Sequence, residues 1–213
     1  MKIKICGLKH PDNIEAVAAL SPDYMGFICY SRSPRFIGEL DEDILATLPD
    51  HILKTGVFVN ASVERINKTM NKYGFEAIQL HGAETPDHCA MFRTKVIVIK
   101  AFGVDEDFDF SRLENYANKV DYFLFDTKTV AHGGSGKTFN WEVLNRYTGD
   151  VPFFLSGGLS LENLAEVGNI KHPMLYGVDL NSRFESAPAL KDIDKLKEAF
   201  NIIKTFNSDE VRS

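Results

Sequence analysis

The first seven residues, MKIKICG, place an amine and a thiol at alternate positions. Lys4 and Cys6 are separated by Ile5, and Ile3 precedes them. Residues two apart in a β-strand share a face, so the lysine and the cysteine would lie on one face and the isoleucines on the other. A thiolate is a base or a nucleophile, and a nearby ammonium favours it. The structural alternatives to a functional role are that the cysteine is only a small buried residue and that the lysine only pairs with a carboxylate.

Three later segments alternate in the same way and carry a polar residue at or next to their carboxyl ends. Their inward positions would be taken by Gln79 and His81, by Asp126 and by Asp179, in the segments AIQLH (77–81), YFLFD (122–126) and LYGVDL (175–180). Each of these residues alone is more often structural than catalytic. Burying several ionisable groups together is costly unless they pair or serve a site. Their convergence with Cys6 therefore favours a functional site.

Eight short β-rich runs recur along the chain, with helical patterns between them. The expected strands are 2–6, 24–29, 55–59, 77–81, 95–102, 122–126, 152–156 and 175–180. The expected helices are 11–20, 41–48, 62–73, 85–92, 111–118, 141–147, 160–167 and about 189–206, with Ser62 and Ser160 as caps. This alternation predicts parallel strands joined by right-handed crossovers.

Eight βα units fit a closed (β/α)₈ barrel, the TIM-barrel fold, in which active sites lie at the carboxyl ends of the strands. An open doubly wound sheet is the structural alternative. Closure is favoured because several of the expected strands carry polar residues at alternate positions, as a barrel interior requires. Strands of an open sheet are buried on both faces and are more uniformly apolar. We expect one compact α/β domain over residues 1–206 with few insertions, followed by a polar tail at 207–213.

Composition excludes several classes of partner. The formal net charge is −6, so the chain has no basic footprint for nucleic acid or an anionic membrane. The three cysteines match neither a disulfide framework nor a zinc-site spacing, and no apolar run is long enough to span a bilayer. We expect a cytoplasmic protein that binds neither nucleic acid nor membrane.

Two glycine-rich segments point to a phosphorylated small molecule. Gly157 and Gly158 follow the seventh expected strand, and the loops after strands seven and eight frequently bind phosphate in this fold. The segment TVAHGGSGKTFNW (129–141) is longer and has the composition of a mobile cover over a substrate. Its spacing does not match a Walker A motif, so we reject a nucleotidase.

At these residues the chain closely resembles phosphoribosylanthranilate isomerases of tryptophan biosynthesis. The segments that carry the resemblance are KICG (4–7), DYMGFI (23–28), SPRFI (33–37), GVFVN (56–60), QLHG (79–82), FDTKT (125–129), GGSGKTFNW (133–141), SGGL (156–159) and VDLNSRFE (178–185). The resemblance implies an isomerase without cofactor or metal that performs an Amadori rearrangement. It implies Cys6 as general base, Asp126 as general acid and Arg35 as the residue that binds the anthranilate carboxylate.

The chemistry sets requirements on these groups. Asp126 must be protonated to act as an acid, so we expect burial or a negative neighbour to raise its pKa. Cys6 must be a thiolate to act as a base. Lys4 either favours that thiolate or only pairs with Asp126 or Asp179, and a pair with Asp126 would lower the aspartate's pKa. The sequence leaves both open.

The remaining site residues are expected to bind substrate. We place His81 beside the aromatic ring or the sugar, and Asp179, Asn181 and Ser182 in the binding site with the two glycines. After the eighth strand this chain has Arg183 where the family usually has a small residue, and Pro188–Ala189 lacks the family's glycine. Arg183 either contacts phosphate or points into solvent, and Arg32 is an alternative to Arg35.

Other functions remain to be weighed. Another phosphosugar isomerase or epimerase barrel would need a second aspartate or several histidine ligands, which the chain does not offer at the expected positions. A non-catalytic phosphoribosyl-binding barrel, docking to another enzyme of the pathway, would tolerate loss of Cys6. Contact with other tryptophan-pathway enzymes is a further expectation.

Overall fold

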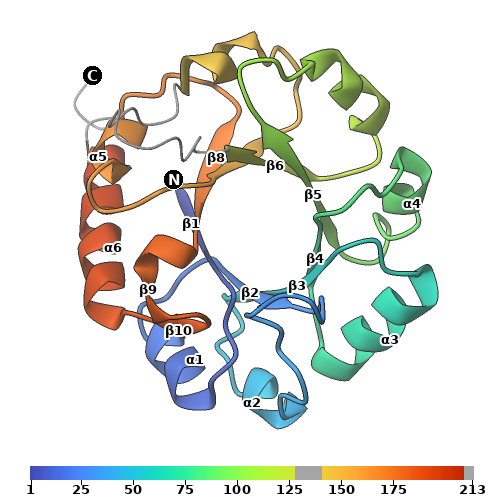
Figure 1. Cartoon of the computed structure of the whole chain (residues 1–213), viewed down its shortest axis with the longest axis vertical. Coiled ribbons are helices and arrows are strands. Elements are labelled where there is room, and N and C mark those ends of the chain that lie inside the picture. The colour runs from blue at the N-terminus through green and yellow to red at the C-terminus, as the bar shows by residue number, and fades with distance from the viewer. Residues whose placement is uncertain (128–140, 209–213) are drawn as a thin grey trace.

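Eight parallel strands close into a barrel (Figure 1). The computed structural model describes residues 1–127 and 141–208. Neighbouring strands pair in chain order, and the last strand pairs with the first. The strands are β1 (Lys2–Cys6), β2 (Tyr24–Ile28), β3 (Leu53–Phe58), β4 (Ala77–Leu80), β5 (Ile97–Val104), β6 (Tyr122–Thr127), β7 (Phe153–Ser156) and β8 (Leu175–Leu180). The predicted closed barrel is confirmed, and the open sheet is excluded.

Helices surround the barrel on its outside (Figure 1). They are α1 (Pro11–Ala18), α2 (Glu42–Ala46), α3 (Val63–Tyr73), α4 (Pro86–Ala90), η1 (Phe110–Tyr116), η2 (Trp141–Arg146), α5 (Leu164–Val167), η3 (Ser182–Phe184) and α6 (Ile193–Ser208). Two helices predicted after β5 and β6 are 3₁₀-helices, η1 and η2. α6 includes Asn207 and Ser208 of the predicted tail, and 209–213 lie outside the described residues.

The two predicted serine caps have different outcomes. Ser62 caps α3, because its hydroxyl accepts a hydrogen bond from the Arg65 amide at 3.3 Å. Ser160 does not begin a helix: α5 starts four residues later, at Leu164. The Asn163 side chain stabilises the turn before α5: its Oδ1 accepts from the Ser160 amide at 2.9 Å, and its Nδ2 donates to the Gly158 carbonyl at 3.0 Å.

The interior of the barrel is divided along its axis. Residues near the amino ends of the strands form an aromatic and aliphatic plug made of Tyr24, Ile99, Ala101, Leu124 and Phe154, with Tyr122 and Tyr176 packed against it. The predicted outward residues pack instead in the main core between strands and helices, namely Ile3, Ile5, Ile78, Leu80, Phe123, Phe125, Val178 and Leu180. Inward residues toward the carboxyl-terminal mouth include the polar Lys4, Gln79 and Asp179.

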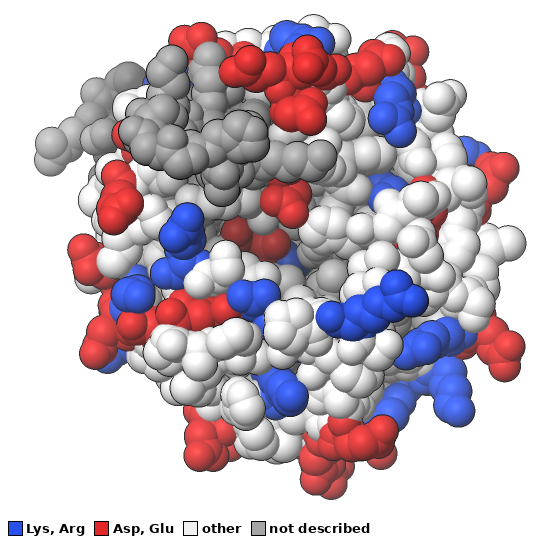
Figure 2. Space-filling view, viewed as in Figure 1, with Lys and Arg blue, Asp and Glu red and all other residues white. Residues whose placement is uncertain are grey.

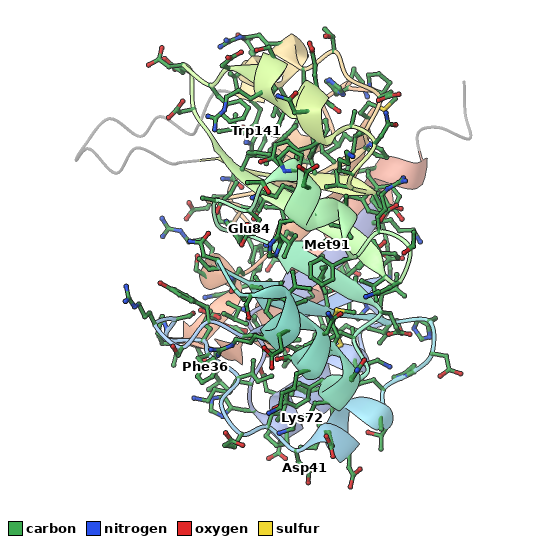
Figure 3. All side chains as sticks on the ribbon, turned by 90° about the vertical axis from the view of Figure 1, so that its right-hand side faces the viewer. Phe36, Asp41, Lys72, Glu84, Met91 and Trp141 are labelled. Atoms are coloured by element: carbon green, nitrogen blue, oxygen red, sulfur yellow. The ribbon has the colours of Figure 1, made fainter. Side chains whose placement is uncertain are left out.

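The mouth is the face nearest the viewer in Figure 1. In the side view of Figure 3, Phe36, from the loop after β2, lies toward the left edge, where the strands end. Glu84, which precedes α4, lies nearer to that edge than Met91, which follows it, as a helix running back along the barrel requires. Among the described residues, no helix is both long and apolar enough to cross a membrane.

A small hairpin interrupts the segment after β8. The helix predicted from residue 189 begins only at Ile193, and an antiparallel hairpin of β9 (Glu185–Ala187) and β10 (Leu190–Lys191) precedes it. Figure 1 shows the hairpin beside α1. The Asn13 side chain of α1 fixes it there: Nδ2 donates to the Lys191 carbonyl at 2.9 Å, and Oδ1 accepts from the Lys191 amide at 2.7 Å.

Candidate active site

Lys4 and Asp179 form a buried ion pair at the floor of the mouth. They lie side by side on the paired strands β1 and β8, and Lys4 Nζ donates to Asp179 Oδ1 at 2.9 Å. Their side chains are 0% and 5% exposed. Burial acts to lower the pKa of Lys4, but Asp179 and Cys6 outweigh it and raise that pKa. Of the two carboxylates considered from the sequence, Asp179 is therefore the partner.

Cys6 ends β1 next to this pair and is buried. Gly26 of β2 lies opposite it, and a Cβ at that position would come within 2.8 Å of Cys6 Sγ. Glycine at position 26 therefore makes room for the thiol. Burial raises the pKa of Cys6 above its ordinary value, and the ammonium groups of Lys4 and Lys191 offset only part of that rise. Lys4 thus favours the thiolate, one of the two roles that the sequence left open, but burial outweighs it.

Asp126 and His81 form the opposite, open side of the mouth. His81 Nε2 lies 3.4 Å from Asp126 Oδ2, and the two side chains are 34% and 40% exposed. Below them, Gln79 Nε2 lies 2.9 Å from His81 Nδ1 and fixes the plane of the imidazole. The alternative pairing of Lys4 with Asp126 is not formed, because Lys4 pairs with Asp179. Residues 129–140 of the glycine-rich segment, expected to cover a substrate, lie outside the described residues, and Trp141 begins η2.

Figure 2 shows a hollow at this face of the molecule, surrounded by charged side chains. Acidic and basic side chains face each other around its centre. Cys6, Asp126, His81 and Asp179 are thus brought to one mouth, at the ends or near the ends of β1, β6, β4 and β8. A molecule with both anionic and hydrogen-bonding groups fits such a rim.

Arg35, from the loop after β2, reaches the mouth beside Gly7. Gly7 has φ +84, and a Cβ there would lie 2.7 Å from Arg35 Cδ. The guanidinium forms a two-point ion pair with Glu185, with Nε at 2.9 Å from Oε1 and Nη2 at 2.7 Å from Oε2. Arg32 and Arg183 are exposed. Arg35 is thus held in one orientation by Glu185, whereas Arg32 is exposed.

The predicted phosphate-binding residues lie at the ends of β7 and β8. Gly157 and Gly158 have φ +87 and +65, which glycine adopts without strain. Asn181 lies deeper, where its Oδ1 accepts from Lys191 Nζ at 2.8 Å, and Ser182 is exposed. Because α5 is short and begins at Leu164, an anion at this turn would be bound by the glycine backbone and not by a helix dipole that starts at Ser160.

Two charged residues of this region were missed from the sequence. Glu185 and Lys191 lie in the β9–β10 hairpin, and their side chains are 4% and 0% exposed. Neither follows a strand of the barrel or a periodic pattern, so no local signal marks them as buried. The contact with Asn13, 178 residues away in the chain, helps to place Lys191 under the mouth.

Comparison with known proteins gives a consistent result. A family model described as N-(5′-phosphoribosyl)anthranilate (PRA) isomerase matches residues 3–202. The chain belongs to this family. The isomerase of Parabacteroides distasonis is 45% identical over 92% of this chain and 90% of its own length. That of Phocaeicola vulgatus is 42% identical over 96% of this chain and 98% of its own.

Solved structures of phosphoribosylanthranilate isomerases have the same fold. The Thermotoga maritima enzyme superposes with a TM-score of 0.85 at 34% identity, over 96% of this chain and 99% of its own. Another, solved with reduced 1-(o-carboxyphenylamino)-1-deoxyribulose 5-phosphate, gives 0.81 at 29% identity, with the same coverage. The family and the enzyme class predicted from the sequence are confirmed.

Proposed function

We propose that this phosphoribosylanthranilate isomerase uses Cys6 and Asp126 as its base and acid. The overall reaction converts N-(5′-phosphoribosyl)anthranilate into 1-(2-carboxyphenylamino)-1-deoxyribulose 5-phosphate, an Amadori rearrangement in tryptophan biosynthesis. The observation that carries the assignment is the placement of one buried thiol and one half-exposed carboxyl on opposite sides of a single mouth. By the family resemblance, no cofactor or metal takes part.

Asp126 acts first. Its carboxyl donates a proton to the ring oxygen of the aminoribose, the C1′–O bond breaks, and the nitrogen lone pair forms a protonated imine (iminium ion) at C1′. Asp126 is exposed enough for substrate to reach it, and His81, at 3.4 Å, holds it in place. Gln79 supports His81 from below. His81 contributes to binding and positioning in this scheme and does not transfer the proton itself.

Cys6 acts second. As a thiolate it takes the proton from C2′, and the electron pair of that C–H bond forms the C1′=C2′ bond of an enolamine while the C=N electrons of the iminium return to the nitrogen as its lone pair. Tautomerisation then gives the ketone at C2′ and a methylene at C1′. Lys4 stabilises the thiolate charge, and Asp179 holds Lys4 in place. Burial raises the pKa of Cys6 and so favours the thiol form over the thiolate.

The remaining residues bind the two ends of the substrate. Arg35 takes the anthranilate carboxylate, for which a planar guanidinium is suited. The backbone at Gly157 and Gly158, with Asn181 and Ser182, takes the phosphate. A cytoplasmic location and contact with other enzymes of tryptophan biosynthesis stay predictions, as does the single domain over residues 1–206.

Turnover of phosphoribosylanthranilate, generated in situ and followed by its fluorescence, tests the assignment. Wild type, Cys6→Ser and Asp126→Asn are compared in parallel. We expect wild-type turnover and a loss of about a hundredfold or more in each variant, the scale of general acid–base catalysis. Variants as active as the wild type would remove the catalytic roles. An inactive wild type would instead favour a phosphoribosyl-binding barrel or a different phosphosugar substrate.

A further inference from the structure

Glu185 accepts hydrogen bonds from one edge of the Arg35 guanidinium. Its Oε1 and Oε2 lie 2.9 and 3.0 Å from Arg35 Nε, and Oε2 lies 2.7 Å from Nη2. Among the described residues, Arg35 Nη1 makes no hydrogen bond, and the Arg35 side chain is 20% exposed. One edge of the guanidinium thus faces Glu185, and the edge formed by Nη1 and the other N–H of Nη2 stays available for a second carboxylate.

Glu185 is itself held rigidly. Lys191 Nζ donates to Glu185 Oε1 at 2.7 Å and to Asn181 Oδ1 at 2.8 Å, and the Ala189 amide donates to Glu185 Oε1 at 3.2 Å. Lys191 is in turn fixed by the Asn13 contact to its backbone. A carboxylate with this many donors in a nearly solvent-free site has one orientation, which it transmits to Arg35.

Charge explains why a lysine must accompany Glu185. Arg35 with Glu185 alone is a neutral pair, and a substrate carboxylate brought against it would face Glu185 without net attraction. Adding Lys191 leaves the cluster of three side chains with one net positive charge. The cluster therefore attracts one further carboxylate while keeping the guanidinium in place.

We infer that Glu185 and Lys191 are positioning residues that aim Arg35 at the carboxylate of the substrate's aromatic ring. This inference rests on the proposed role of Arg35. The rival account is that Glu185 competes with the substrate for Arg35 and must leave when substrate binds. The two accounts predict opposite effects of removing Glu185, because a positioning residue strengthens binding and a competitor weakens it.

Binding of two probes to catalytically intact protein separates these accounts. One probe is the reduced product, 1-(o-carboxyphenylamino)-1-deoxyribulose 5-phosphate with its ketone reduced, and the other is the same molecule made from aniline, without the carboxylate. The variants are Glu185→Gln, Lys191→Met and the double variant. The double variant keeps the wild-type net charge of the cluster and leaves only Arg35, which is 20% exposed, without a partner. It therefore separates orientation from charge and is the variant best able to fold.

We expect the carboxylate probe to bind about tenfold or more weakly to all three variants, as loss of a partner in a buried charged cluster implies. The aniline probe should change less than about threefold, because it makes no contact with Arg35. Glu76→Gln, which removes the partner of Lys54 outside the mouth, is the control and should change neither probe. Tighter binding of the carboxylate probe to Glu185→Gln, or equal losses for both probes, would overturn the inference.

Steady-state kinetics and NMR add readouts that a purely structural role would not move. In Glu185→Gln, KM should rise and kcat should stay within about threefold, since uniform binding is lost. In arginine-labelled wild type, the Arg35 Nε–H should stay protected from exchange when the reduced product binds; loss of protection would show that Glu185 is displaced. If wild type binds the reduced product but shows no turnover, the proposed function fails and the positioning inference is still judged by the two probes.

Discussion

The two sides of the mouth solve the same problem differently. On the β8–β1 side, Cys6 lies in a dry network whose charges, Lys4 and Asp179, are 0% and 5% exposed. On the β4–β6 side, Asp126 and His81 are 40% and 34% exposed. The dry side fixes geometry and shifts pKa values through burial, whereas the open side is accessible to substrate. The difference fits a base that must be precisely placed at one carbon and an acid that substrate must reach.

The sharpest challenge to this division is removal of the buried thiol. Cys6→Ala should lower kcat/KM by about a hundredfold to ten-thousandfold, because it removes the base. Cys89→Ala is the matched control: Cys89 is also buried, but it lies in α4, outside the mouth, and its loss should leave kcat/KM within about threefold. Equal losses in the two variants would mean that packing, and not base chemistry, explains the effect.

The burial of the Lys4–Asp179 ion pair can be tested through the free energy of unfolding. Lys4→Met leaves Asp179 buried without its partner and should lower the free energy of unfolding by about 3–5 kcal/mol. Lys2→Met breaks an ion pair two residues earlier on the same strand, where Lys2 and Asp23 are 48% and 31% exposed, and should cost less than about 1 kcal/mol. Denaturant unfolding followed through Trp141 fluorescence compares them. Equal losses would contradict a dry floor.

Dependence on pH tests the same side through the thiol. Burial raises the pKa of Cys6 above its ordinary value of 9.0. The wild type needs both a protonated Asp126 and a Cys6 thiolate, so its pH profile does not isolate the thiol. In Asp126→Asn only the thiolate has to form, so kcat/KM should rise with pH, at a lower absolute rate than the wild type, and should not level off below about pH 9. A plateau near neutral pH in Asp126→Asn would show that the ammonium groups outweigh burial.

The smallest expected effect concerns the hairpin that supports the dry side. Ala189 has φ +69, a conformation that costs an alanine about 1–2 kcal/mol relative to glycine. After the greater freedom of glycine in the unfolded chain is subtracted, Ala189→Gly should raise the free energy of unfolding by up to about 1 kcal/mol. Ala187→Gly, in β9 and without a positive φ, should lower it by about 0.5–1 kcal/mol. The reverse order would contradict the strain.

The sequence predicted the inward residues of the barrel strands but not the buried residues of the β9–β10 hairpin. Alternation within strands correctly assigned Lys4, Cys6, Asp126 and Asp179 to the interior, because a barrel strand has a strict period of two and the pattern is local. The hairpin and the burial of Glu185 and Lys191 depend on a contact with Asn13 across most of the chain. No local period encodes such a contact. The segments of η1 and η2 were predicted as helices but not as 3₁₀-helices, because the two types of helix have similar periodicity over so few residues.

The isotope effect at C2′ of the substrate tests the central claim most directly. Substrate with deuterium at C2′ is compared with unlabelled substrate in single turnovers of wild type, Cys6→Ser and Asp126→Asn. If Cys6 removes the C2′ proton and Asp126 opens the ring, Cys6→Ser will show a primary isotope effect, because C–H cleavage limits its rate. Asp126→Asn will show an effect near unity, because ring opening limits it. The same isotope effect in both variants would contradict the division of roles between the buried and the open side.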